Sequence, residues 1–163
     1  MTGKTVACVN ASGRQASSFI RVASAIGWHV RAQMRNCEGV IAEEMCGLPN
    51  VEVVEGDLDA ADSNGIIRKL FRNVQLAFVN TTHWGDEVGI GCALADAAKR
   101  AGVQHYVYSS MPDHSTFGHG WKALPLWSRK FDIENHIRQI GLPATFVYTG
   151  IYNNNFTSLN YPL

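Results

Sequence analysis

A polar turn after the first apolar segment of the chain has the residue types needed to bind a phosphate group. Asn10, Gly13 and Ala16 give the spacing N-x-x-G-x-x-A between an apolar run over 5–9 and a helical pattern over 16–26. Dinucleotide-binding turns carry G-x-G-x-x-G here, because glycine lets the backbone approach a pyrophosphate and the next helix begins with free N–H groups. Asn10 can adopt the left-handed conformation that glycine otherwise provides. By itself, the turn fits a plain strand-to-helix connection equally well.

Residues that are mostly polar or small also follow the later apolar runs of the chain. They are Arg35, 56–58, 80–82, 109–111 and 149–150. In open α/β sheets, ligands bind outside the carboxyl ends of the strands, where all of these residues would lie. Their recurrence favours a nucleotide site over a plain turn.

Two arginines stand where NAD-binding enzymes place an acidic residue on the ribose, about 20 residues after the glycines. Arg35 comes just after the apolar run 29–34, so its guanidinium can reach the 2′-phosphate of NADP. Arg31 lies within that run, and alternation along the strand predicts a solvated charge at the sheet edge instead. The cofactor expected from these residues is NADP or NAD, with Arg35 favouring NADP.

Short β-branched runs alternate with segments of helical period, which predicts an α/β fold, a Rossmann-type doubly wound parallel sheet. The expected strands are 5–9, 29–34, 51–54, 76–79, 105–108 and 144–148, and the expected helices are 16–26, 40–45, one around 66–71, 87–101 and 125–140. We expect Ser63 to cap the helix around 66–71. The helix 87–101 starts with acidic residues and ends with Lys99 and Arg100, which complements its dipole.

The pattern continues to residue 148, so residues 1–150 are predicted to form an NAD(P)-binding Rossmann domain. Residues 151–163 read as a tail that would lead into a missing C-terminal subdomain. Apolar side chains from Tyr148 to Phe156 are therefore expected to be incompletely buried.

Composition limits the classes of function and the compartment. The 14 Lys and Arg residues balance 14 Asp and Glu residues without a long run of one sign, which argues against direct nucleic-acid binding. The N-terminal apolar run is too short for a secretory signal or a membrane span, so a cytoplasmic or nuclear location is expected. The four cysteines show no C-x-x-C spacing and are expected to be free thiols, with Cys8 packed in a strand. No metal site is predicted.

Several longer motifs carry a family resemblance over nearly the whole chain. The segments VNASGRQ, HVRAQMR, FVNTT, DEVGIGCALADAAKRAG, HYVYSSMPDHS and GLPATFVYTGIYNNNFTSL resemble the N-terminal part of the NmrA-like family, an atypical branch of the short-chain dehydrogenases/reductases. The resemblance implies a redox-sensing NAD(P)-binding protein that negatively regulates transcription in nitrogen metabolite repression. It further implies protein–protein contact with a GATA-type zinc-finger transcription factor.

The same resemblance implies which residues contact the cofactor. Asn10, Gly13, Arg14 and Gln15 would contact the pyrophosphate, and Arg35 the ribose side. Asn80, Thr81, Thr82 and Lys130 would lie on the nicotinamide side, and Tyr148, Gly150 and Ile151 would close the far end.

The position four residues before Lys130 bears on catalysis. Dehydrogenases of this superfamily use Tyr-x-x-x-Lys, in which the lysine orients ribose and lowers the tyrosine pKa. Leu126 stands at the tyrosine position and has no proton to give, so no catalytic residue is assigned. The alternative is an NAD(P)H-dependent oxidoreductase that takes its proton from Tyr148, Tyr152 or a water held by Asn80. A third reading is a truncated product that does neither.

Overall fold

The computed structural model describes residues 4–83, 85–150, 152, 153 and 155. In this part of the chain, parallel strands form a sheet in the order β3-β2-β1-β4-β5-β6. The strands are β1 (Thr5–Cys8), β2 (His29–Met34), β3 (Val51–Glu55), β4 (Leu76–Val79), β5 (His105–Ser110) and β6 (Ala144–Tyr148). The strand order reverses between β1 and β4, which makes this the doubly wound Rossmann-type sheet that the sequence predicts.

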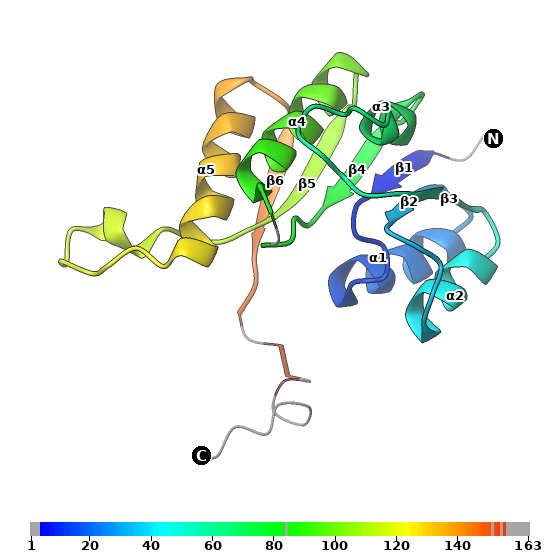
Figure 1. Cartoon of the computed structure of the whole chain (residues 1–163), viewed down its shortest axis with the longest axis horizontal. Coiled ribbons are helices and arrows are strands. Elements are labelled where there is room, and N and C mark those ends of the chain that lie inside the picture. Colours follow the sequence, from blue (N-terminus) through cyan, green and yellow to red (C-terminus); the bar gives the residue numbers. More distant parts are fainter. Residues whose placement is uncertain (1–3, 84, 151, 154, 156–163) are drawn as a thin grey trace.

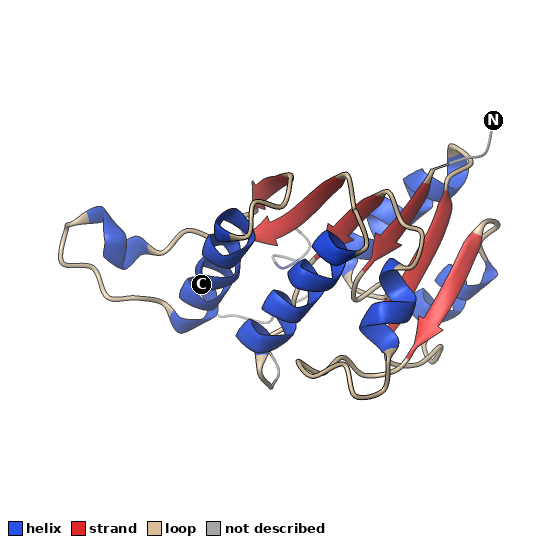
Figure 2. Ribbon diagram, turned by 90° about the horizontal axis from the view of Figure 1, so that it is seen from above, coloured by secondary structure: helices blue, strands red, loops and turns tan. Residues whose placement is uncertain are grey.

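Helices cover both faces of the sheet (Figures 1 and 2). On one face lie α1 (Arg14–Ala25) and α2 (Val40–Gly47); on the other lie α3 (Ile66–Phe71), α4 (Glu87–Arg100) and α5 (Pro125–Gln139). A short 3₁₀ helix, η1 (His114–Phe117), lies on a loop that projects away from the sheet in Figure 1.

Alternation along β1 divides the core into two layers. Val6 and Cys8 pack under α1 and α2, whereas Ala7 and Val9 pack under α3, α4 and α5. The prediction that Cys8 is packed in a strand is confirmed. At the other edge, Tyr148 of β6 is 50% exposed, as expected for incomplete burial there, and Phe156 lies outside the described residues.

The start of α3 differs from the sequence expectation. Ser63 does not cap this helix, because its hydroxyl and backbone N–H both donate to Asp59. The Asp62 carboxylate instead accepts the backbone N–H groups of Ile67 and Arg68, at 2.8 and 3.1 Å. The two oxygens of this carboxylate each accept one of the free N–H groups at the helix start.

Arg31 is not a solvated edge charge, and that prediction was wrong. Its side chain is 14% exposed, and its Nε donates to Glu52 Oε2 at 3.0 Å. Its Nη1 donates to backbone carbonyls at the end of α3, those of Lys69, Leu70 and Arg72. The crossover that brings α3 back over β2 places these carbonyls beside Arg31, where a cation is favourable.

Candidate functional site

Two adjoining cavities open at the carboxyl ends of the strands. The first has a volume of about 310 Å³ and is lined by Val9, Asn10, Ser12, Gly13, Gln33, Met34, Arg35, Asp57, Leu58, Thr81, Thr82, Glu87 and Ile90. The second has a volume of about 230 Å³ and is lined by Gln15, Asn80, Thr81, His83, Ser109, Met111, Leu126, Trp127, Lys130, Thr149, Gly150, Tyr152 and Asn155. Thr81 lines both, so the cavities meet at the end of β4 and provide an elongated site across the point where the strand order reverses.

The turn between β1 and α1 presents free backbone N–H groups. Asn10 has a φ of 55°, so the predicted left-handed conformation is confirmed. Its side-chain amide donates to the Asn80 carbonyl at 2.7 Å, which ties the turn to the end of β4. Gly13 is the N-cap of α1, with no side-chain cap and no acidic residue in the first turn. The positive end of α1 is therefore available to an anion.

Gln33 holds the neighbouring strand ends together, a role that sequence reasoning missed. Its side chain is buried; Oε1 accepts the Asn10 backbone N–H at 3.1 Å and Nε2 donates to the Gly56 carbonyl at 2.8 Å. Gln33 thus links β1, β2 and the end of β3 beneath the first cavity. A glutamine inside a predicted strand carried no signal for this bridge, because both partners are distant in sequence.

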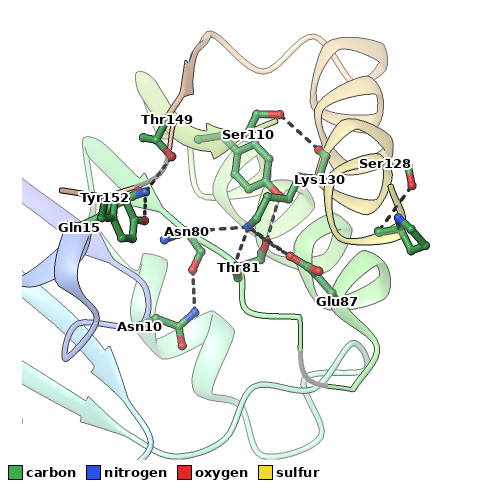
Figure 3. Close-up of polar contacts among 12 residues, drawn as sticks. Asn10, Gln15, Asn80, Thr81, Glu87, Ser110, Ser128, Lys130, Thr149 and Tyr152 are labelled. Carbon is green, nitrogen blue, oxygen red and sulfur yellow. Dashed lines mark hydrogen bonds and ion pairs between the residues drawn. The ribbon is translucent and has the colours of Figure 1, made fainter. Parts of the chain in front are cut away.

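Lys130 of α5 reaches across to the end of β4 (Figure 3). Its Nζ lies 3.2 Å from Asn80 Oδ1, 2.7 Å from the Thr81 carbonyl and 3.1 Å from Thr81 Oγ1. It also forms an ion pair with Glu87 Oε1 at 3.2 Å. The ammonium has three N–H groups and four protein acceptors, so its hydrogen-bonding capacity is filled within the protein.

Glu87 is the buried counter-charge of Lys130, and it too was missed as a site residue. Its side chain is 0% exposed, and its Oε1 also accepts the Thr81 hydroxyl at 2.8 Å. Its second oxygen, Oε2, is buried without a hydrogen-bond partner. Burial lowers the pKa of Lys130, and the charge and hydrogen bond of Glu87 partly oppose that shift. From sequence, Glu87 is one more acidic residue at a helix start.

Buried neutral groups bear on the alkaline stability of the protein. Burial raises the pKa of the Cys8 thiol and of the Tyr106 and Tyr108 hydroxyls far above their ordinary values of 9.0 and 10.0. Above those values the unfolded chain releases protons that the folded protein keeps, so the free energy of unfolding should fall. Lys130 acts in the opposite sense below 10.5, because its pKa is lowered, so it offsets part of the fall below that value and none of the fall above it, where the two tyrosines also act.

We therefore expect the free energy of unfolding to be constant near neutral pH and to fall above about pH 9, as measured by urea titrations at several pH values. Cys8→Ala should flatten this fall by about 1.4 kcal/mol per pH unit. Cys92→Ala is the matched control, with a smaller effect because that thiol is less buried. If the free energy of unfolding depends on alkaline pH identically in Cys8→Ala and the wild type, the raised pKa of Cys8 is contradicted.

The residues considered as proton donors differ in whether they reach the second cavity. Leu126 lines the second cavity, so the position before Lys130 that carries tyrosine in dehydrogenases is apolar. The Tyr148 hydroxyl donates to Glu134, 3.0 and 2.9 Å from its two oxygens, and lies in neither cavity. Tyr152 does line the second cavity, where its hydroxyl contacts Gln15 Nε2. Of the two tyrosines considered as proton donors, only Tyr152 lines the second cavity.

Most residues of the predicted site come together. The first cavity contains Asn10, Gly13, Arg35, Thr81 and Thr82, and the second contains Gln15, Asn80, Thr81, Lys130 and Gly150.

Two predicted residues, Arg14 and Tyr148, line neither cavity, and a third is not described. Arg14 lines an adjoining exposed groove instead, and its Nη1 donates to Asn155, which lines the second cavity. Tyr148 is turned toward Glu134, because successive side chains of a strand point to opposite faces and its parity directs it over α5. Ile151 lies outside the described residues.

Over the described ranges, no cluster of three His, Cys, Asp or Glu side chains is arranged to hold a metal ion. None of the helices in that part of the chain is long and apolar enough to cross a membrane.

Comparison with known proteins assigns the chain to a family. The model of the NmrA-like family matches residues 2–163. The chain belongs to the NmrA-like family. This confirms the resemblance read from the motifs of the glycine turn and the strand ends.

Curated members of the NmrA-like family are closely similar to this chain. It is 59% identical over 162 residues to the nitrogen metabolite repression protein nmrA of Emericella nidulans, covering 98% of this chain and 45% of that protein. It is 56% identical over 184 residues to the nitrogen metabolite repression protein nmr of Neurospora crassa, covering 98% of this chain and 38% of that protein. The chain spans less than half the length of these relatives.

Solved structures of NmrA, a negative transcriptional regulator, have the same fold. The complexes of NmrA with NAD and with NADP each superpose with a TM-score of 0.90 at 56% identity, covering 99% of this chain and 49% of NmrA. The Rossmann-type fold predicted from sequence is confirmed.

Proposed function

We propose that this chain is the dinucleotide-binding part of a negative transcriptional regulator, and that NAD or NADP occupies the two adjoining cavities. The observation that carries the proposal is the open N-terminus of α1 beside two cavities that meet at Thr81. The NAD and NADP complexes of NmrA support it, because 99% of this chain superposes on that protein. When bound, NAD(P) can accept or donate a hydride. An enzyme uses that chemistry, whereas a sensor needs only to bind the forms of NAD(P) with different affinity.

The residues present fit such a ligand. The backbone N–H groups at the start of α1 suit the pyrophosphate, and Arg35 supplies a cation at the end of β2. Glu87 borders the first cavity but is 0% exposed at its side chain, so it supports the site through Lys130 and Thr81.

We infer that the protein acts in nitrogen metabolite repression by reporting the dinucleotide state to a transcription factor of the GATA zinc-finger type. The names and descriptions of the relatives support the regulatory role. Reporting requires a coupling free energy, so dinucleotide and partner must change each other's affinity by the same factor.

Calorimetric titration with NAD, NADH, NADP and NADPH tests the proposal directly. A sensor should bind at least one form and discriminate by oxidation state or by the 2′-phosphate, without turnover. If none of the four forms binds in these titrations, a dinucleotide site in this chain is excluded.

A second function, NAD(P)H-dependent reduction, is favoured by one observation, the Tyr152 hydroxyl in the second cavity. Against it stands Leu126 at the usual proton-donor position. Oxidation of NADPH that requires a carbonyl substrate and is lost in Tyr152→Phe would support a reductase instead of a sensor.

Arg35→Ala is expected to lower NADP affinity by about tenfold or more and to change NAD affinity little. Arg35 lines the first cavity just past β2, and charge-assisted hydrogen bonds from a guanidinium to a phosphate contribute about 1.5 to 3 kcal/mol. Arg68→Ala is a charge-matched control, since Arg68 is exposed and lies outside both cavities. Equal losses for NADP and NAD in Arg35→Ala would place Arg35 on another part of the ligand.

A further inference from the structure

Two cysteines that belong to neither cavity lie next to each other. Cys37 lies between β2 and α2, and Cys46 lies in the last turn of α2. Their Sγ atoms are 2.7 Å apart, with the Cys46 thiol donating to Cys37. A disulfide has an S–S distance of about 2.05 Å, so closing this bond needs a movement of less than about 1 Å. Both side chains are partly exposed, which allows small oxidants to reach them.

The position of this pair connects it to the first cavity. Cys37 is two residues after Arg35, in the irregular segment 35–39, whereas Cys46 is on a helix anchored by the buried side chains of Ala42 and Met45. A covalent bond between the two sulfurs would tie this segment to the anchored helix.

We propose that Cys37 and Cys46 are a reversible disulfide site, and that the bond fixes the segment carrying Arg35 against α2. The oxidant is a low-molecular-weight disulfide such as oxidised glutathione. One cysteine thiolate attacks it and expels one small thiolate, forming a mixed disulfide; the second cysteine then attacks the mixed disulfide and expels the other. The two cysteines lose two electrons and two protons, and the small disulfide becomes two thiols.

The bond has a consequence for ligand binding, which rests on the proposed function. A segment held in place loses less conformational freedom when Arg35 binds a phosphate, so the cost of ordering it falls. The oxidised protein should therefore bind NADP about two- to tenfold more tightly than the reduced protein, with NAD affinity unchanged. By reciprocity, NADP should favour the disulfide by the same factor.

The site itself is tested by peptide mapping, without any dinucleotide. The protein is incubated with oxidised glutathione at about pH 8.5 to increase the thiolate fraction, because the hydrogen bond from Cys46, burial and Glu55 raise the pKa of Cys37 to about 11. Remaining thiols are alkylated, and the chain is cut with trypsin and a Glu-specific protease. Cleavage after Arg35, Glu38, Glu44 and Glu52 separates peptides 36–38 and 45–52, which stay joined only through a Cys37–Cys46 bond.

Joined peptides are expected for the wild type and for the control Cys92→Ser, and they should be absent in Cys46→Ser. Alkylated or glutathione-bound peptides 36–38 and 45–52 from the oxidised wild type would overturn the disulfide site.

Titration with NADP and NAD then compares oxidised and reduced wild type with Cys46→Ser treated in the same way. A gain in NADP affinity confined to oxidised wild type is expected. Joined peptides with unchanged NADP affinity would overturn only the proposed effect of the disulfide on Arg35 and would leave the disulfide site in place. Failure of every form to bind either dinucleotide would overturn the proposed function while leaving the mapped bond in place.

Discussion

Replacing Lys130 by methionine is expected to lower the free energy of unfolding by about 3 to 5 kcal/mol, because the substitution leaves a buried carboxylate without its counter-ion. Glu87 is 0% exposed at its side chain, has one oxygen without a partner, and would keep the Thr81 hydroxyl as its hydrogen-bond donor. Methionine has a similar length and an apolar end, so the loss reports the uncompensated charge rather than a large cavity. Urea unfolding measures it.

The double variant Lys130→Met/Glu87→Gln provides the decisive comparison. Removing both charges should recover more than half of the loss, since a buried amide costs far less than a buried carboxylate. Arg21→Met is a control for an exposed ion pair: Arg21 and Glu44 lie 2.6 Å apart, but their side chains are 41% and 39% exposed. That variant should lose less than about 1 kcal/mol. Equal losses in the single and double variants would show that burial of the Lys130 stem, and not its charge, is what matters.

Gly13→Val is expected to weaken NAD and NADP binding by at least about a hundredfold while the chain still folds. Gly13 has an ordinary φ of −73°, so a side chain strains the backbone little. A Cβ at this position would lie 3.1 Å from the Asn10 carbonyl oxygen, a tight contact, and the two branches of valine would extend over the open N-terminus of α1. They would occupy the space through which a pyrophosphate reaches the N–H groups.

Gly47→Val is the matched control for this substitution. Gly47 ends α2, is exposed, lies outside both cavities and has open space where a Cβ would be. Both variants should keep the circular dichroism spectrum of the wild type, and Gly47→Val should keep its dinucleotide affinity. Unchanged affinity in folded Gly13→Val would remove the phosphate from the α1 terminus and with it the proposed orientation of the ligand.

The Lys130 network also bears on sensing as opposed to catalysis. In dehydrogenases the lysine of Tyr-x-x-x-Lys orients ribose and lowers the tyrosine pKa. Here the residue four positions earlier is Leu126, and the ammonium is held by Asn80, Thr81 and Glu87. This arrangement supports the proposed sensor, because it positions the end of β4 between the two cavities without activating a proton donor.

The amino-acid sequence by itself determined the fold and the position of the glycine turn. Strand and helix periods are properties of neighbouring residues, so the alternation of β-branched and helical segments was sufficient to predict the doubly wound sheet. The left-handed Asn10 and the arrival of Arg35 at the first cavity followed for the same reason, since each depends on a turn or a strand end close by in sequence.

Only the tertiary structure decided how the site is held together. Glu87 meets Lys130, and Gln33 meets Asn10 and Gly56, because the order β3-β2-β1-β4-β5-β6 brings distant segments together at the carboxyl ends of the strands. Away from that edge, the crossover through α3 brings the end of this helix to Arg31 of β2. No local sequence pattern predicts these contacts, because the partner of each polar side chain depends on how the helices and strands pack. The same physical reason explains Cys37 and Cys46, which lack a recognisable spacing in the chain and become a pair only when α2 folds back beside the end of β2.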